Sequence, residues 1–144
     1  MEKRMAAERN KELIARFDAA VARGDVDALD ELCTQDMVNH ALAADRPKGL
    51  EGTREFVRDG MPQFQGDDWA DSVIVAEGDY VVQFGVRAGT WRGGPFLGFD
   101  VTPGPYSRYV AFCYRVRDGK IAERWAMRDD LAMLRQLGAF SSWH

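Results

Sequence analysis

The first third of the chain carries apolar residues at helical spacing. In residues 8–25 they recur every three or four positions, and this stripe consists of Leu13, Ile14, Phe17, Ala20 and Val21. The stripe predicts a helix, which the glycine after it ends. Residues 26–33 predict a second, short helix, and the looser spacing of residues 49–64 predicts a third. Residues 37–42, which lie between these two helices, predict a short strand.

From residue 71 onwards the apolar residues recur every second position, which is typical of strands. Residues 71–91 contain two such runs around a Glu-Gly-Asp turn, a hairpin sequence. Residues 108–116 and 121–127 alternate in the same way and flank a second turn. Residues 130–138 return to helical spacing and end in a glycine.

Helices followed by a meander of strands predict an α+β fold with a mostly antiparallel sheet. We expect three N-terminal helices to pack on a curved sheet and a short C-terminal helix to follow it. A sheet half wrapped by helices forms a cone-shaped barrel, and the open mouth of such a cone usually holds a ligand.

Composition limits the classes of partner. The chain has 144 residues, 46% of them hydrophobic and 29% charged, which predicts one globular domain over residues 1–144. The net charge is −4 and no basic stripe is present, so we expect no nucleic acid partner. No apolar leader or membrane-length apolar run occurs, which favours a cytoplasmic protein without a membrane partner. Cys33 and Cys113 fit no metal-binding spacing, and we predict no metal site.

An ordered set of segments carries a family resemblance. The segments are ARGDVDALDEL, MVNH, PKGLEGTREFV, VAEGDYVV, FLGFDVTPG, RDGKIAERW and DDLAMLRQLG. In their order, the chain resembles the SnoaL-like polyketide cyclases and ester cyclases of the nuclear-transport-factor-2-like (cystatin-like cone) superfamily. The resemblance implies a small-molecule enzyme of secondary metabolism that needs no cofactor. It also implies a homodimer formed through the outer face of the sheet.

The catalytic residue of the resembling cyclases does not carry over. Those cyclases use an aspartate on the last strand as general acid and base, and matching places it at Ala126, which cannot exchange a proton. A histidine of some cyclases falls near Phe112 and a pocket tyrosine falls on Phe17, whereas Asn39 matches a pocket position. The resemblance therefore implies the fold but not the aldol mechanism.

Strand alternation predicts which side chains replace that site. If Ala126 points into the cone, residues of the same parity on the last two strands do so as well. These residues are Ala122, Arg124, Arg128, Arg108, Val110, Phe112 and Tyr114. The residues predicted to face outward, toward a dimer partner, are Ile121, Glu123, Trp125 and Met127.

The candidate roles follow from side-chain chemistry. We predict His40 and Asp129 as acid–base residues and Arg124 as the catalytic group that stabilises an enolate or polarises a carbonyl. The substrate-binding candidates are Asn39, Phe17, Trp91, Arg108, Phe112, Tyr114, Ala126 and Arg128. Asp129 is expected first of all to cap the following helix, which would make it a weaker base, and Asp130 is expected to face solvent.

These residues favour acid–base chemistry of the cyclase, isomerase or hydro-lyase type on a hydrophobic oxygenated substrate such as a polyketide, in an enclosed pocket. Two other classes stay open. The loss of the aspartate favours a non-catalytic ligand-binding or dimeric accessory protein. An oxygenating relative is the other, because some family members without the aspartate are similar to hydroxylases.

Overall fold

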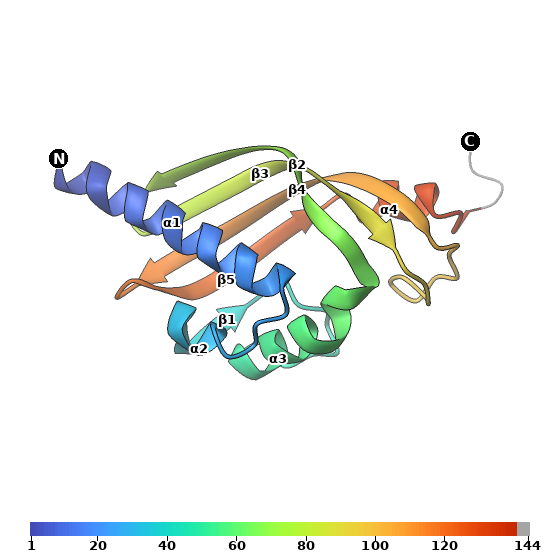
Figure 1. The fold of residues 1–144 in the computed structure, drawn as a ribbon, viewed down its shortest axis with the longest axis horizontal. Helices are drawn as coiled ribbons and strands as arrows, with labels where there is room; N and C mark the ends of the chain where they lie inside the picture. The colour runs from blue at the N-terminus through green and yellow to red at the C-terminus, as the bar shows by residue number, and fades with distance from the viewer. Residues whose placement is uncertain (141–144) are drawn as a thin grey trace.

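A long helix lies along the concave face of a curved five-stranded sheet (Figure 1). The computed structural model describes residues 1–140. The elements are α1 (Glu2–Ala22), α2 (Leu29–Leu32), β1 (Cys33–Asn39), α3 (Leu50–Glu55), η1 (Phe56–Gly60), η2 (Met61–Gln63), β2 (Phe64–Glu77), β3 (Tyr80–Trp91), β4 (Gly104–Arg117), β5 (Lys120–Arg128) and α4 (Asp130–Gln136). The predicted α+β cone, with three helices before the main meander and a short one after it, is confirmed.

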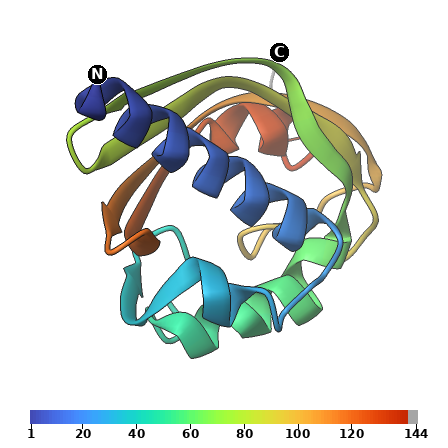
Figure 2. The same ribbon diagram turned by 60° about the vertical axis from the view of Figure 1, so that its left-hand side comes forward.

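The strand order is β1-β5-β4-β3-β2, and all neighbours are antiparallel except β1 and β5. The strands curve around α1 and α4, which leaves the convex face of the sheet without a covering helix (Figure 2). No helix of the described part of the chain is long and apolar enough to cross a membrane.

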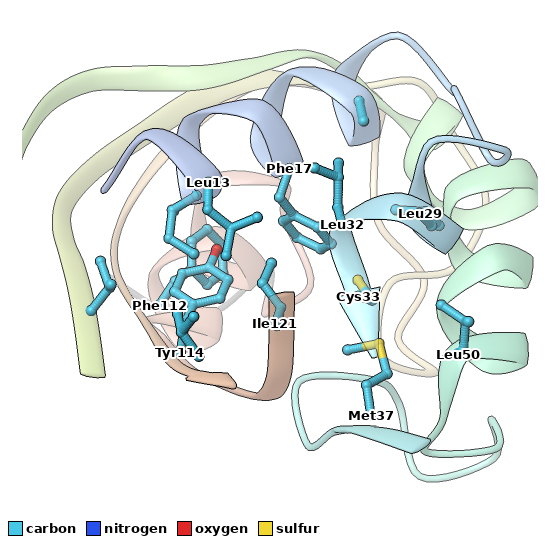
Figure 3. Packing of buried hydrophobic residues seen from close by; sticks show 14 of the residues in the cluster. Leu13, Phe17, Leu29, Leu32, Cys33, Met37, Leu50, Phe112, Tyr114 and Ile121 are labelled. Carbon is cyan, nitrogen blue, oxygen red and sulfur yellow. The ribbon is translucent and has the colours of Figure 1, made fainter. Parts of the chain in front are cut away.

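The main core lies between the helices and the concave face. The predicted stripe of α1 is buried there at Leu13, Ile14, Phe17 and Ala20. It packs against side chains from α2, β1, α3 and the strands, and Figure 3 labels Leu29, Leu32, Cys33, Met37, Leu50, Phe112, Tyr114 and Ile121 among them. Removing this apolar surface from water stabilises the cone.

A second cluster closes one end of the cone. The helix α4 packs on β4 and buries Met133 and Leu134. The complete buried set is Trp91, Phe96, Tyr106, Met133, Leu134 and Leu137. The interior is therefore bounded by α1 and α3 on one side and by this cluster at the far end.

The third predicted helix is shorter than residues 49–64. α3 ends at Glu55, and one π-helical turn and one 3-10 turn connect it to β2, which begins at Phe64 rather than at residue 71. Glycine, here Gly60, has a low α-helix propensity, and Pro62 lacks the N–H that an α-helix would use. The α-helical pattern therefore could not continue to Phe64.

The prediction that Ile121 faces outward is wrong. The β4–β5 pairing shifts register, because Arg115 pairs with Glu123 while Val116 pairs with Ile121. Ala122 is the extra residue of this bulge, and both Ile121 and Ala122 are buried. Beyond the bulge the predicted alternation holds.

Candidate functional site

The inner face of the sheet carries four arginines. Arg87 lies on β3 directly opposite Arg108 on β4, and Arg124 and Arg128 lie on β5. Three of them surround one ring: the guanidinium carbons of Arg124, Arg87 and Arg128 lie 4.3, 5.6 and 5.7 Å from the centre of Phe112. Cations over the face of an aromatic ring are attracted to its electrons.

Arg87 is neutralised by carboxylates. Its Nε donates to Oδ1 of Asp67 at 2.6 Å, and its Nη1 donates to Oδ1 of Asp18 at 3.4 Å. The other oxygen of Asp67 accepts from the hydroxyl of Tyr106 at 2.6 Å. Burial alone would lower the pKa of Arg87, but the Asp67 and Asp18 charges raise it above its usual range. Burial and the bond to Asp67 raise the pKa of Tyr106.

The adjacent aspartates at the start of α4 have different roles. Asp129 caps the helix, as predicted, because its Oδ1 accepts from the backbone N–H of Ala132 at 3.1 Å. Asp130 was expected to face solvent, but its Oδ1 lies 2.5 Å from Nη1 of Arg108. The Arg108 side chain is only 6% exposed and that of Asp130 is 36% exposed. A buried cation therefore draws the second aspartate inward.

Arg124 and Arg128 have no comparable partners. Among residues 1–140, no carboxylate lies within ion-pair distance of either. Nη1 of Arg128 donates to the carbonyl of Ala41 at 3.3 Å, whereas the buried Nε of Arg124 has no hydrogen-bond partner in the same range. Burial, followed by the charges of Arg124 and Arg108, lowers the pKa of Arg128 to about 10. Both residues are partly exposed, in contrast to Arg87 and Arg108, which are buried.

The comparisons with known proteins agree with this architecture. The sequence profile of the SnoaL-like polyketide cyclases matches residues 11–137. The chain belongs to this family. Comparison with curated proteins finds no match.

Solved structures of the family and its relatives superpose along nearly the full chain. TsrD from Streptomyces laurentii has 27% sequence identity and a TM-score of 0.77, over 92% of this chain and 97% of that one. IdmH from Streptomyces antibioticus, named as a candidate polyketide cyclase, has 31% identity and a TM-score of 0.72, over 90% and 98%. AclR from Streptomyces galilaeus, named as a candidate hydroxylase, shares the fold at 23% identity and a TM-score of 0.73, over 92% and 97%.

The structure groups several predicted site residues of this SnoaL-like chain around Arg124. Its guanidinium carbon lies 5.5 Å from the ring centres of both Phe17 and Tyr114, in addition to the contact with Phe112. Ala126 pairs with Phe112 across the β4–β5 ladder. These aromatic walls, labelled in Figure 3, form the apolar surroundings of the arginines.

Asn39 pairs with Arg124 across the parallel β1–β5 ladder, whereas Trp91 lies away from the arginine pair. Asn39 is buried, its amide donates to Thr53 of α3 at 3.0 Å, and its carbonyl accepts from the N–H of Ala41 at 3.1 Å. Trp91 lies in the end cluster, where its Nε1 donates to the carbonyl of Gly94 at 3.0 Å. Asn39 therefore joins β1 to α3, and Trp91 closes the cone.

His40 lies with the outward residues of β5. Its ring stacks on Trp125 with centres 5.3 Å apart, and its Nε2 lies 2.7 Å from Oε2 of Glu123. The bond from His40 holds the pKa of Glu123 below its usual range. The backbone N–H of His40 donates to the carbonyl of Arg124 at 2.8 Å and Asp129 directly follows Arg128, but the side chains of His40 and Asp129 bond to Glu123 and to the α4 backbone instead.

Asp67, Arg87 and Tyr106 form an interior polar group that was not among the candidates. Asp67 lies in the part of β2 that was assigned to the third helix and its connection, next to a left-handed glycine, Gly66, with φ of 67°. Strand alternation could have predicted that Arg87 points inward, because it lies an even number of positions from Val81 and from Trp91 on β3, and both of these residues are buried.

A groove of about 740 Å³ lies between α1 and the neighbouring strands. It reaches Asp18 and Asp67, the two partners of Arg87, and Ile74 lies on its wall. This groove is open, unlike the enclosed pocket predicted from the sequence. In the described part of the chain, no three His, Cys, Asp or Glu side chains converge in a way that could hold a metal ion.

Proposed function

We propose that this SnoaL-like chain is a small-molecule enzyme that performs cyclisation, isomerisation or addition and elimination of water on a hydrophobic oxygenated substrate such as a polyketide, without a cofactor. The supporting observation is the arginine pair, Arg124 and Arg128, which lies beside Phe112 and has no carboxylate partner among residues 1–140. Fixed cations in apolar surroundings stabilise an enolate or alkoxide as its charge develops. The cytoplasmic location and the single domain over residues 1–144 stay predictions.

Asp130 is the proton acceptor in this proposal, in place of the carboxylate that Ala126 lacks. Both oxygens of Asp67 are bonded, one to Arg87 and the other to Tyr106, and its side chain is 8% exposed. Asp130 is more accessible, at 36%, and its charge acts on Arg128. A carboxylate held at the edge of a cation cluster can remove a proton alpha to a carbonyl while the arginines stabilise the product anion.

Replacing Arg124 with methionine is expected to slow enolisation about 100-fold or more, the usual effect of removing one oxyanion-stabilising group. The assay follows exchange of the alpha protons of β-tetralone, a flat aromatic ketone, in deuterium oxide by NMR. Asp130→Asn should slow exchange as well. The matched control is Arg117→Met, an arginine paired with Asp36 on the surface, which should leave the rate unchanged. Wild-type protein that does not accelerate exchange, or an unchanged rate in Arg124→Met, contradicts the proposal.

A non-catalytic ligand-binding protein is the second candidate, and the proton-inert Ala126 favours it. The same assay separates the two functions. An enzyme accelerates exchange of the ketone's protons, whereas a binding protein protects or only binds the ketone.

We also propose that the outer face of the sheet forms a homodimer. Large apolar side chains are exposed there: Val73 is 51%, Phe84 45%, Tyr109 72% and Met127 55% exposed. Phe84 and Met127 both pair with Ala111, so these side chains form a continuous row across three strands. No helix of the described residues covers this face (Figure 2). An apolar patch of this kind marks a protein interface.

Phe84→Glu is expected to weaken this dimer at least about tenfold, because association would bury an unpaired charge. Size-exclusion chromatography with light scattering over a dilution series measures the change. Leu97→Glu is the control, because Leu97 is 56% exposed but lies in the connection between β3 and β4, away from the patch. A wild-type chain that is monomeric at high concentration, or a dimer unaffected by Phe84→Glu, contradicts the assignment.

A further inference from the structure

The interior of the cone holds more positive than negative charge. Arg87 is offset by Asp67 and Asp18, and Arg108 is offset by Asp130. Arg124 and Arg128 complete the set of inward arginines on the last three strands, and neither is paired with a carboxylate of the described residues. Burying a cation without a counter-ion raises the free energy of the folded protein. An anionic ligand that binds beside these arginines would supply the missing counter-ion and would be attracted to them.

The unused hydrogen-bond donors of these arginines also favour an anionic ligand. The Nε of Arg124 is buried and unpaired, and so is the Nε of Arg108, within the described residues. Within residues 1–140, the hydrogen bond of the Arg128 side chain goes to the backbone carbonyl of Ala41 rather than to a charge. A guanidinium presents a planar set of donors that matches the two oxygens of a carboxylate.

The residue between Arg124 and Arg128 adds no carboxylate that would compete with a ligand for the two guanidinium groups. Ala126 lies between Arg124 and Arg128 on β5 with the same inward parity, and its side chain is a single methyl group. The ring of Phe112 lies under both guanidinium groups, and the ring of Tyr114 flanks Arg124. The surroundings therefore combine two cations with flat apolar walls.

We propose that Arg124 and Arg128 bind the carboxylate of a ground-state substrate, so that the natural ligand is a flat, apolar carboxylic acid in its ionised form. The carboxylate lies between the two guanidinium groups beside the partly exposed Ala126, and the apolar body lies on the accessible side of the pair, because the aromatic rings behind it are buried in the core. This inference rests on the proposed function and narrows it, because it assigns a charge to the substrate before any reaction takes place.

Calorimetric titration of the full chain with naphthoate, with naphthamide and with inorganic phosphate tests this assignment. Naphthoate and naphthamide share a flat body and differ in charge, and we expect naphthoate to bind at least about tenfold more tightly than naphthamide or phosphate. Arg124→Met and Arg128→Met should each weaken naphthoate binding about tenfold. Arg117→Met, the surface control, should not change it. Equal affinity for naphthoate and naphthamide overturns the carboxylate site, and equal affinity for phosphate overturns the apolar part of the ligand.

A second variant tests the site without removing an arginine. Ala126→Asp places a carboxylate between Arg124 and Arg128 and should abolish the preference for naphthoate over naphthamide. Ala126→Asn has the same size without the charge and should keep the preference. A preference that survives in Ala126→Asp overturns the proposal.

The binding and exchange assays fail independently. Preferential naphthoate binding without exchange of β-tetralone protons refutes the enzyme and supports the carboxylate site. Exchange without preferential naphthoate binding supports the enzyme and refutes the carboxylate site.

Discussion

Arg87→Met is expected to lower the free energy of unfolding by about 3–5 kcal/mol, the usual cost of breaking a buried ion pair from one side. The Arg87 side chain is 5% exposed, and that of its partner Asp67 is 8% exposed. Methionine removes the charge but keeps much of the packing against Trp69, whose ring centre lies 4.8 Å from the Arg87 guanidinium carbon. Asp67 would remain buried without its cation, and urea unfolding followed by circular dichroism measures the loss.

An exposed ion pair provides the control for Arg87. Arg117 lies 2.5 Å from Asp36, with side chains 44% and 70% exposed, and Arg117→Met should cost about 1 kcal/mol or less. The double variant Arg87→Met with Asp67→Asn should recover part of the loss, since it leaves no unpaired buried charge. A cost for Arg87→Met no larger than that of Arg117→Met would show that the Arg87 pair is not buried as the structure has it.

The local period of the sequence was sufficient to predict part of the site. Alternation along a strand depends only on neighbouring residues, so it placed Arg108, Arg124, Phe112 and Tyr114 on the inner face before the structure was known. The helical stripe of α1 was predictable for the same reason. A family resemblance then supplied the cone into which these residues point.

The partners of the arginines could not be predicted in this way. Asp67 and Arg87 are 20 residues apart, and Arg108 and Asp130 are 22 apart, so each contact depends on how strands and helices close in space. His40 directly follows β1, and the face of the sheet on which its side chain lies depends on the parallel pairing of β1 with β5. No local pattern in the sequence reports such pairings.

The bulge in β5 is the clearest case in which strand alternation gave a wrong prediction, and it can be tested by comparing Ile121 with Met127. Simple alternation gives Ile121 and Met127 the same outward face, but the structure buries Ile121 completely and leaves Met127 55% exposed. Ile121→Ala is therefore expected to lower the free energy of unfolding by about 2–5 kcal/mol, because it removes methylene groups from the main core and leaves a cavity.

Met127→Ala is the matched control on the same strand and should change stability by about 0.5 kcal/mol or less. Both changes are made in the Phe84→Glu background, so that dimer contacts at Met127 do not contribute to the urea midpoints. The extra residue of the bulge, Ala122, causes this difference. It shifts the alternation of β5 by one position at the register shift between Arg115 and Val116, so that Ile121 points inward. Equal losses for the two alanine variants would mean that β5 pairs without a bulge. Arg124, Arg128 and Met127 lie on the same side of the bulge, so their alternation would stay as it is and only Ile121 would turn outward.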